Sequence, residues 1–143
     1  MAVDFRLKLD PSPAEVDAVL QPLVGFNRTA NGRLGFQPFA IHITEGDEVT
    51  GGIVGMANFD WLIVQYLFVP DTMRGQGVGT RLMADAERFA REHGCIGVWL
   101  DTFSFQARPF YEKLGYSVFG EIEDHPRGLS RYFLSKRLDG ATG

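Results

Sequence analysis

Residues 69–80 read Val-Pro-Asp-Thr-Met-Arg-Gly-Gln-Gly-Val-Gly-Thr, a glycine-rich turn between an apolar run and a helical pattern. Gly75, Gly77 and Gly79 carry no Cβ atom, so a ligand can approach the backbone closely. At the start of the following helix, unpaired N–H groups and the helix dipole favour an anion, typically a phosphate. The stretch therefore predicts a strand, a phosphate-binding turn and a helix, in that order.

The elements on either side of this turn follow from hydrophobic periodicity. The apolar run from Trp61 to Val69 predicts a central strand that is covered on both faces. The helix is expected from about Gln76 to His93, and its Glu87 and Arg91 are spaced for an i,i+4 ion pair. A further strand, from Ile96 to Leu100, is expected to run parallel to the first through a right-handed crossover.

The remaining elements come before and after this unit. Alternating apolar residues predict a strand from Val3 to Leu9, and a capping box from Ser12 to Glu15 begins a helix. Residues Gly25 to Gly35 are expected to form a loop, with a short helical piece in it as an option. We expect an α/β fold, a single domain over residues 1–143, with a mixed, mostly antiparallel twisted sheet of about seven strands. The other predicted elements are strands at Phe39–Ile43, Val49–Phe59, Tyr116–Ile122 and Arg131–Leu138, and a short helix at Gln106–Leu114.

Composition argues against several classes of partner. The chain has 143 residues, 45% of them apolar, and a net charge of −4, so it has no basic footprint for nucleic acid. The single cysteine, Cys95, rules out an internal disulfide and fits a reducing compartment. No signal peptide or membrane-length apolar run is visible, and the three histidines show no metal-ligand spacing. We expect a cytoplasmic protein with no membrane, nucleic-acid or metal partner.

The glycine spacing can be compared with two nucleotide-binding patterns. The Rossmann fingerprint needs G-x-G-x-x-G, which Gly75, Gly77 and Gly79 do not match. A P-loop ends in Gly-Lys-Ser/Thr, whereas no lysine follows Gly79. The turn instead matches the pattern Arg/Gln-x-x-Gly-x-Gly/Ala, through Arg74, Gly77 and Gly79.

With this pattern the chain resembles the GNAT superfamily of N-acetyltransferases. A second segment is similar to that superfamily's Ala-x-x-Phe/Leu-Tyr-Glu-Lys-x-Gly-Phe/Tyr motif: Ala107-Arg108-Pro109-Phe110-Tyr111-Glu112-Lys113-Leu114-Gly115-Tyr116. Two motifs in this order are far more specific than either alone, and the order of elements agrees over nearly the whole chain. The resemblance implies the GNAT fold, with helices on both faces of the sheet and the fourth and fifth strands parallel and splayed.

The resemblance also implies acetyl-coenzyme A as the cofactor. In the family, the pyrophosphate lies on backbone N–H groups of the glycine turn, and the pantetheine arm lies along the fourth strand like an added strand. Many members contact the arm through an asparagine three residues before the motif alanine; Ser104 stands there, and Gln106 could substitute for it. The other implied cofactor-binding residues are Leu67, Phe68, Val69, Arg74, Gly75, Gln76, Gly77, Val78, Gly79 and Thr80.

Tyr111 is the expected general acid. In the family, the tyrosine of this segment lies near the thioester sulfur and protonates the leaving thiolate. No motif identifies the general base that would take the proton of the amine. Gln65 stands in a region where some members carry a glutamate, and glutamine cannot take a proton. Asp101, at the end of the fifth strand, is the best-placed carboxylate by topology, and a water chain to solvent is an equal alternative. Asp60 and His42 are more remote candidates for the base. Gln65, His42 and Trp61 are expected to contact the acceptor.

The sequence thus predicts an enzyme that moves acetyl from acetyl-coenzyme A to a primary amine by direct attack. Backbone N–H groups near Leu67 to Val69 would polarise the thioester carbonyl. The acceptor, a small molecule or a protein amine, is not readable from the motifs, and a homodimer is left open. Two alternatives keep the fold without the chemistry: a non-catalytic acyl-coenzyme A sensor and an interaction module.

Overall fold

The structure, a computed structural model, describes residues 2–31 and 36–140. Contacts within the chain divide it into two compact units, Met1–Leu34 and Gly35–Gly143. The single domain expected over residues 1–143 stays a prediction. The cleft discussed below is formed within the second unit alone.

The first unit contains one helix, α1, which spans Pro13–Asn31. The predicted capping box is confirmed: the Ser12 N–H donates to Glu15 Oε1 (2.9 Å), and the Glu15 N–H donates to Ser12 Oγ (3.1 Å). The loop predicted from Gly25 onward was wrong as far as residue 31, because one glycine costs a helix only about 1 kcal/mol and does not end it. The rest of that predicted loop, residues 32–35, lies outside the described residues.

The strand predicted from Val3 to Leu9 is absent from the described structure. Residues 2–8 are extended chain with no assigned secondary structure, and no described strand pairs with them. A strand needs a hydrogen-bonded neighbour as well as alternation, so the pattern alone was not sufficient. The sheet therefore has six strands in place of about seven.

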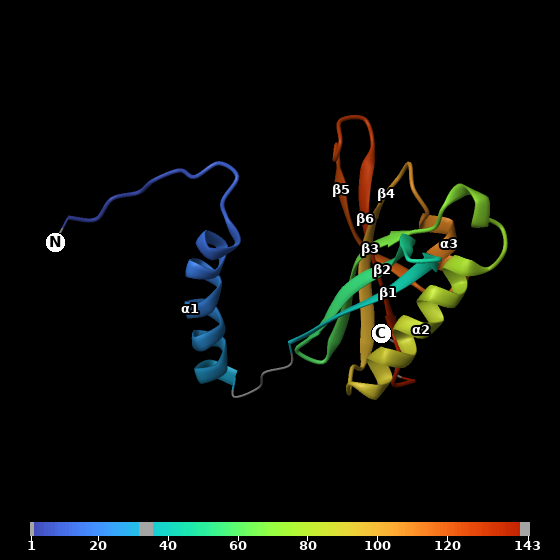
Figure 1. Ribbon diagram of the computed structural model, residues 1–143, viewed down its shortest axis with the longest axis horizontal. Coiled ribbons are helices and arrows are strands. Elements are labelled where there is room, and N and C mark those ends of the chain that lie inside the picture. Colours follow the sequence, from blue (N-terminus) through green and yellow to red (C-terminus); the bar gives the residue numbers. More distant parts are fainter. Residues whose placement is uncertain (1, 32–35, 141–143) are drawn as a thin grey trace. The chain divides into compact units, whose positions relative to one another are not determined.

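The second unit is built on this six-stranded sheet, with strand order β1-β2-β3-β4-β6-β5 (Figure 1). β3 and β4 form the parallel pair, and all other neighbouring pairs are antiparallel. The predicted mixed, mostly antiparallel sheet is confirmed. The strands are β1 (Gln37–Glu45), β2 (Glu48–Asn58), β3 (Trp61–Phe68), β4 (Gly97–Phe103), β5 (Ser117–Glu123) and β6 (Ser130–Arg137).

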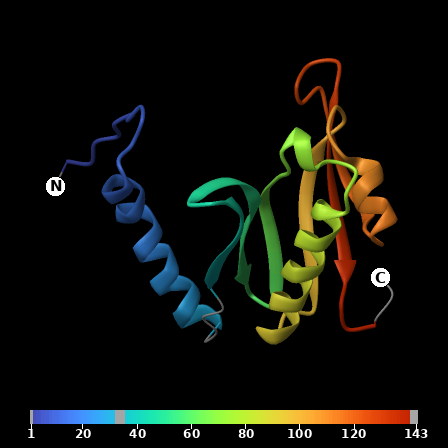
Figure 2. The ribbon, with the colours of Figure 1, turned by 45° about the vertical axis from the view of Figure 1, so that its right-hand side comes forward.

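Helix α2 (Val78–Glu92) packs against β2, β3 and β4 (Figures 1 and 2). It buries Leu82, Met83 and Ala86 against the sheet, and each large apolar side chain removed from water contributes about 1.5–3 kcal/mol. A short 3-10 turn, η1 (Asp71–Met73), precedes it. Helix α3 (Arg108–Lys113) follows β4. The fully buried large side chains of the core are Ile53, Leu62, Met83, Val98, Leu100 and Leu134.

The parallel strands β3 and β4 pair over only part of their length. Their register runs from Trp61↔Gly97 to Val64↔Leu100. Beyond that point β4 pairs only with β6, as far as Phe103, and β3 pairs only with β2. Gln65 has no partner in β2, and a bulge of this kind bends a strand. The predicted splay of these two strands is confirmed.

Candidate active site

A cleft of about 1350 Å³ lies where β3 and β4 separate. The splayed parts of both strands, the glycine turn, the start of α2 and the start of α3 form its walls. Segments far apart in the sequence therefore meet in one place. The predicted site residues that line the cleft are Gln65, Leu67, Phe68, Val69, Arg74, Gly75, Gly77, Val78, Gly79, Thr80, Asp101, Gln106 and Tyr111.

Four other predicted site residues do not line this cleft. His42 lies on the edge strand β1, and Trp61 lies at the paired end of β3, where it lines a separate hollow. The Ser104 hydroxyl accepts a hydrogen bond from the Ser130 N–H (3.1 Å), and the Gln76 side chain donates to the Thr72 carbonyl (3.1 Å). Ser104 and Gln76 thus hold turns together.

The glycine turn presents its backbone to the cleft. Gly75 and Gly77 have φ values of 76° and 77°, in the left-handed region that favours glycine. Gly77 caps α2 without a side-chain hydrogen bond, so the first N–H groups of the helix remain for an anion. The Arg74 side chain bends back onto the turn: Nε donates to the Val69 carbonyl (3.2 Å), and Nη1 pairs with Asp71 (2.8 Å).

The splayed part of β3 has one unpaired backbone edge. On one side β2 pairs with it as far as Gly52↔Phe68, while on the other side β4 leaves it after Val64. An extended molecule with amide groups can pair with such an edge as an added strand. The arm of coenzyme A has this character, so the edge and the glycine turn together could hold the cofactor.

Tyr111 lies on α3, and only 6% of the residue is exposed. Its ring contacts those of Phe110 and Tyr116 edge-on. Burial, and to a smaller degree the negative charge of Asp101, raise the pKa of Tyr111 to about 12. The phenol is therefore neutral at physiological pH and can donate a hydrogen bond into the cleft.

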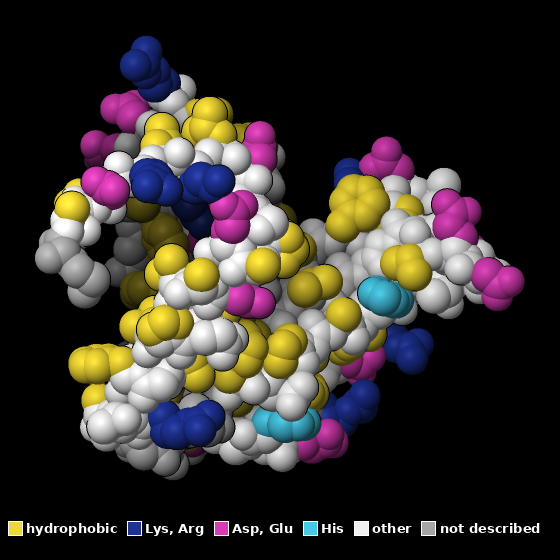
Figure 3. Space-filling model, turned by 60° about the vertical axis from the view of Figure 1, so that its left-hand side comes forward, with side chains coloured by type: hydrophobic (Ala, Val, Ile, Leu, Met, Phe, Trp, Pro, Cys, Tyr) yellow, Lys and Arg dark blue, Asp and Glu magenta, His cyan; other side chains and the backbone are white. Residues whose placement is uncertain are grey.

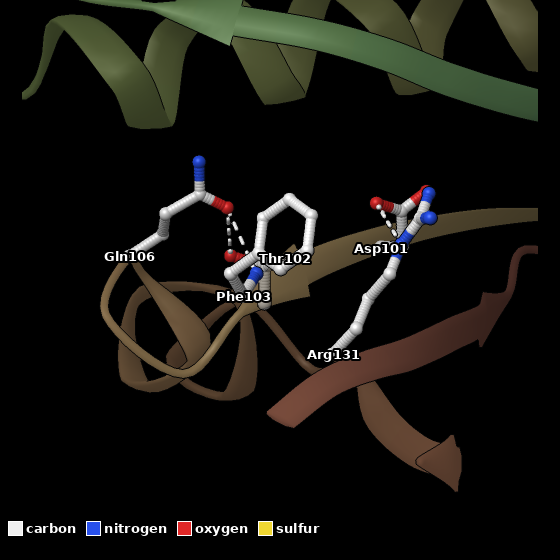
Figure 4. A network of polar contacts seen from close by, with 5 residues as sticks. All are labelled: Asp101, Thr102, Phe103, Gln106 and Arg131. Carbon is white, nitrogen blue, oxygen red and sulfur yellow. Dashed lines mark hydrogen bonds and ion pairs between the residues drawn. The ribbon is translucent and has the colours of Figure 1, made fainter. Parts of the chain in front are cut away.

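Gln106 closes the turn that follows β4 (Figure 4). Its Oε1 accepts hydrogen bonds from the Thr102 hydroxyl (3.2 Å) and the Phe103 N–H (2.8 Å). The Thr102 Oγ1 accepts a third bond, from the Ala107 N–H (3.3 Å), next to the start of α3. Figure 4 shows the Gln106 amide nitrogen pointing away from Thr102. This nitrogen is the part of the side chain that remains for a ligand.

Asp101 has a partner that the sequence did not indicate (Figure 4). Arg131 of β6 donates from Nε to Oδ1 (3.0 Å) and lies with Nη2 2.9 Å from Oδ2. The hydrogen bond to Asp101 raises the pKa of Arg131, which keeps the guanidinium charged. The guanidinium carbon also lies 5.4 Å and 5.3 Å from the ring centres of Phe103 and Phe133.

Sequence reasoning missed Arg131 as a cleft residue, although it lines the cleft with Asp101 and Tyr111. It lies 30 residues from Asp101, and only the β4–β6 register, with Phe103 opposite Arg131, brings the two together. The available signal was an arginine at the start of a predicted strand, followed by aromatic residues. The other cleft walls are mostly apolar, among them Ile63, Trp99, Leu100, Phe103, Phe105 and Phe110.

Metal and membrane partners can be checked over residues 2–31 and 36–140. Within these ranges no three His, Cys, Asp or Glu side chains are grouped closely enough to hold a metal ion. None of the helices there is both long and apolar enough to cross a bilayer. On the face shown in Figure 3, Lys and Arg side chains are scattered among Asp and Glu side chains.

The fold and the cleft can now be set beside known proteins. A family profile, described as the Acetyltransferase (GNAT) family, matches residues 11–116. The chain belongs to the GNAT acetyltransferase family. It is therefore an acyl-coenzyme A-dependent acetyltransferase, and its cofactor is acetyl-coenzyme A. The family, enzyme class and cofactor implied by the sequence are confirmed, whereas the roles of single residues stay predictions.

Individual relatives of this GNAT acetyltransferase agree with the assignment. It is 40% identical over 131 residues to acetyltransferase Atu2258 of Agrobacterium fabrum, covering 90% of this chain and 96% of that protein. It is 41% identical over 107 residues to blasticidin-S acetyltransferase of Streptomyces morookaense, covering 71% and 79%. A crystal structure of a protein described as an acetyltransferase from Agrobacterium tumefaciens superimposes with a TM-score of 0.88 at 37% identity, covering 94% of this chain and 99% of that chain.

Proposed function

We propose that this GNAT acetyltransferase acetylates the primary amine of a small molecule by direct attack, with Tyr111 as the general acid. The observation that supports this most is the position of Tyr111. Its buried, neutral phenol lines the same cleft as the unpaired edge of β3 and the uncapped start of α2. A proton donor, backbone donors and an anion site thus share one cavity.

The cofactor-binding residues divide into two groups by chemistry. The backbone N–H groups from Gly77 to Thr80 would hold the pyrophosphate, because they begin a helix that has no side-chain cap. The edge of β3 from Leu67 to Val69 would pair with the pantetheine amides and donate an N–H to the thioester carbonyl. The Gln106 amide nitrogen would help hold the arm, in the role that the family usually gives to asparagine.

Tyr111 would stabilise the departing sulfur. A phenol with a pKa of about 12 holds its proton more tightly than an ordinary thiol, whose pKa is about 8.5. The same burial disfavours a charged thiolate in this cleft, so it raises the pKa of the thiol and reduces the difference between the two pKa values. Tyr111 therefore donates a hydrogen bond as negative charge develops on sulfur, and the proton follows as the thiol leaves.

The acceptor amine must lose a proton before it can attack. Asp101 is the proposed base, but Arg131 already contacts both of its carboxylate oxygens. A chain of water through the cleft mouth is the competing route. The two routes make different predictions for an Asp101→Asn variant.

We infer a small-molecule acceptor because one relative, at 41% identity, is a blasticidin-S acetyltransferase. A protein amine is the weaker alternative, since no observation on the cleft favours a polypeptide. A homodimer and a cytoplasmic location also stay predictions. Light scattering in solution would decide the first of these two, and fractionation of cells would decide the second.

Gly77→Val tests the position of the cofactor. Valine is strained at a φ of 77°, and a Cβ at this position would project into open space at the start of α2. We expect acetyl-coenzyme A affinity to fall at least about a hundredfold, measured by calorimetric titration, because the valine side chain occupies the anion site. Gly94→Val is the matched control: it imposes similar strain, at a φ of 74°, at the opposite end of the same helix.

Normal cofactor affinity in Gly77→Val would mean that the pyrophosphate lies elsewhere. Thiol release on a panel of small amines then separates an enzyme from a sensor. Cofactor binding without thiol release on any amine would contradict acetyl transfer and favour the acyl-coenzyme A sensor.

A further inference from the structure

We propose that Arg131 determines acceptor specificity by binding a carboxylate of the acceptor, so that the preferred substrates are primary amines that also carry a carboxylate. This inference rests on the proposed amine acetylation and adds a substrate class to it. It concerns a residue outside both sequence motifs, brought to the cleft by the last strand of the sheet.

Arg131 lies beyond the proposed reaction centre when the cleft is followed from the glycine turn. At the turn, a Cβ on Gly79 would lie 3.2 Å from the Phe110 ring, so the start of α2 adjoins α3. Phe110 contacts Tyr111, and Tyr111 lines the same cleft as Asp101, which Arg131 binds. Followed from the anion site, the cleft therefore passes Tyr111 and then the Asp101–Arg131 pair. An acceptor that approaches opposite the cofactor would meet Arg131.

The guanidinium is held in one orientation with donors to spare. Asp101 engages Nε and Nη2, and the rings of Phe103 and Phe133 lie within cation–π distance. A guanidinium has five N–H donors, so the Nη1 group and the second N–H of Nη2 remain available. Such a pre-oriented fork suits a carboxylate, because two parallel N–H···O bonds can form without further ordering.

The charges in this part of the cleft suit a dipolar acceptor. Asp101 and Arg131 are each less than a third exposed, so their charges are only partly screened by water. The other cleft arginine, Arg74, is bound to Val69 and Asp71 of the glycine turn. An acceptor with its carboxylate on Arg131 would have its amine directed toward Asp101 and Tyr111, the end of the cleft where the acetyl group would lie.

The test uses acceptors that differ only in the carboxylate. Thiol release from acetyl-coenzyme A would be measured with 3-aminopropanoate and 6-aminohexanoate, each against its primary amide. For the better pair we expect the wild-type kcat/KM to be at least about tenfold higher for the carboxylate. In Arg131→Gln this ratio should fall below about twofold, because KM rises more for the carboxylate than for the amide, whatever the loss of the Asp101 contact costs both substrates alike.

Two further variants distinguish the loss of a carboxylate contact from misfolding or a general disturbance of β6. Arg131→Lys keeps the charge but not the fork, so it should retain an intermediate preference even if Arg131→Gln folds poorly. Arg137→Gln is the matched control on the same strand. Arg137 also makes two bonds to an aspartate, Asp139 (3.0 Å and 2.7 Å), and lies 5.9 Å from a ring, that of Trp61, but it does not line the cleft. Its replacement should leave the ratio unchanged.

A binding measurement covers the case in which none of these amines is acetylated. The coenzyme A complex would be titrated with hexanoate and with hexanamide, followed by tryptophan fluorescence, to which Trp99 in the cleft wall and Trp61 contribute. Hexanoate should bind at least about fivefold more tightly, and Arg131→Gln should remove the difference. Equal binding of the two probes, or an equal loss of both in Arg131→Gln, overturns this inference alone. Failure to bind acetyl-coenzyme A would instead contradict the proposed function.

Discussion

Two carboxylate–cation pairs attach β6 to its neighbours, one on each face of the sheet. Lys136 donates to both oxygens of Glu87 on α2 (2.9 Å and 3.2 Å), and Arg131 makes the corresponding contacts with Asp101 on β4. Positions 131 and 136 differ by an odd number, so strand alternation directs their side chains to opposite faces. Each pair joins one carboxylate to one cation of β6, although only Arg131 carries a guanidinium fork.

The surroundings of the two pairs differ, and this decides what each can do. Glu87 is 7% exposed, and its second partner is the Tyr116 hydroxyl (2.9 Å). Burial and the charge of Glu87 raise the pKa of Tyr116, so its hydroxyl remains a donor. Asp101 and Arg131 instead line a cleft. A pair whose carboxylate is buried and bound by a second donor therefore stabilises the fold, while a pair beside a cavity can meet a ligand.

The largest expected effect is on the Glu87–Lys136 pair. Glu87→Ala would leave the Tyr116 hydroxyl and the Lys136 ammonium without their carboxylate, so we expect it to lower the free energy of unfolding by about 3 kcal/mol or more. Asp101→Ala should cost only about 1 kcal/mol, because the Asp101 side chain is 27% exposed whereas that of Glu87 is 9% exposed. Denaturant unfolding measures both. Equal losses from the two substitutions would remove the contrast between the pairs.

The next largest effect is a contrast between Tyr111 and Tyr116, one of which should affect turnover and the other stability. Tyr111→Phe should lower kcat by about a hundredfold or more, with little change in unfolding temperature, because it removes the proposed acid. Tyr116→Phe should do the opposite: it costs about 1–3 kcal/mol of stability by removing a donor to Glu87, and it leaves kcat nearly unchanged. Full turnover in Tyr111→Phe with an accepted amine would show that another group protonates the thiol.

The smallest effects concern pH and the base. Tyr111 acts as an acid only while protonated, which holds below its pKa of about 12, so kcat/KM should show no falling limb from this residue between about pH 6 and pH 10. Asp101→Asn should lower kcat less than about tenfold if water removes the amine proton, because Arg131 already binds the carboxylate. A hundredfold loss of kcat would identify Asp101 as the base.

Patterns formed by residues close together in the sequence were sufficient to predict the family, the cofactor and most of the secondary structure. The two motifs determined the family, the cofactor and the order of the elements around the cleft, because turns, caps and hydrophobic periodicity depend on residues a few positions apart. The Ser12–Glu15 capping box and the left-handed Gly75 and Gly77 are features of this kind. Such patterns failed for Val3 to Leu9, where a strand needed a partner from elsewhere in the chain.

Only the tertiary structure decided which charged side chains meet. Sequence spacing paired Glu87 with Arg91 along one helix, whereas Glu87 is buried against Tyr116 and Lys136, 29 and 49 residues away. Arg131 reaches Asp101 across 30 residues for the same reason. Contacts of this range depend on strand order and register, which no local pattern contains, since shifting one strand by one residue would exchange the faces to which these side chains point.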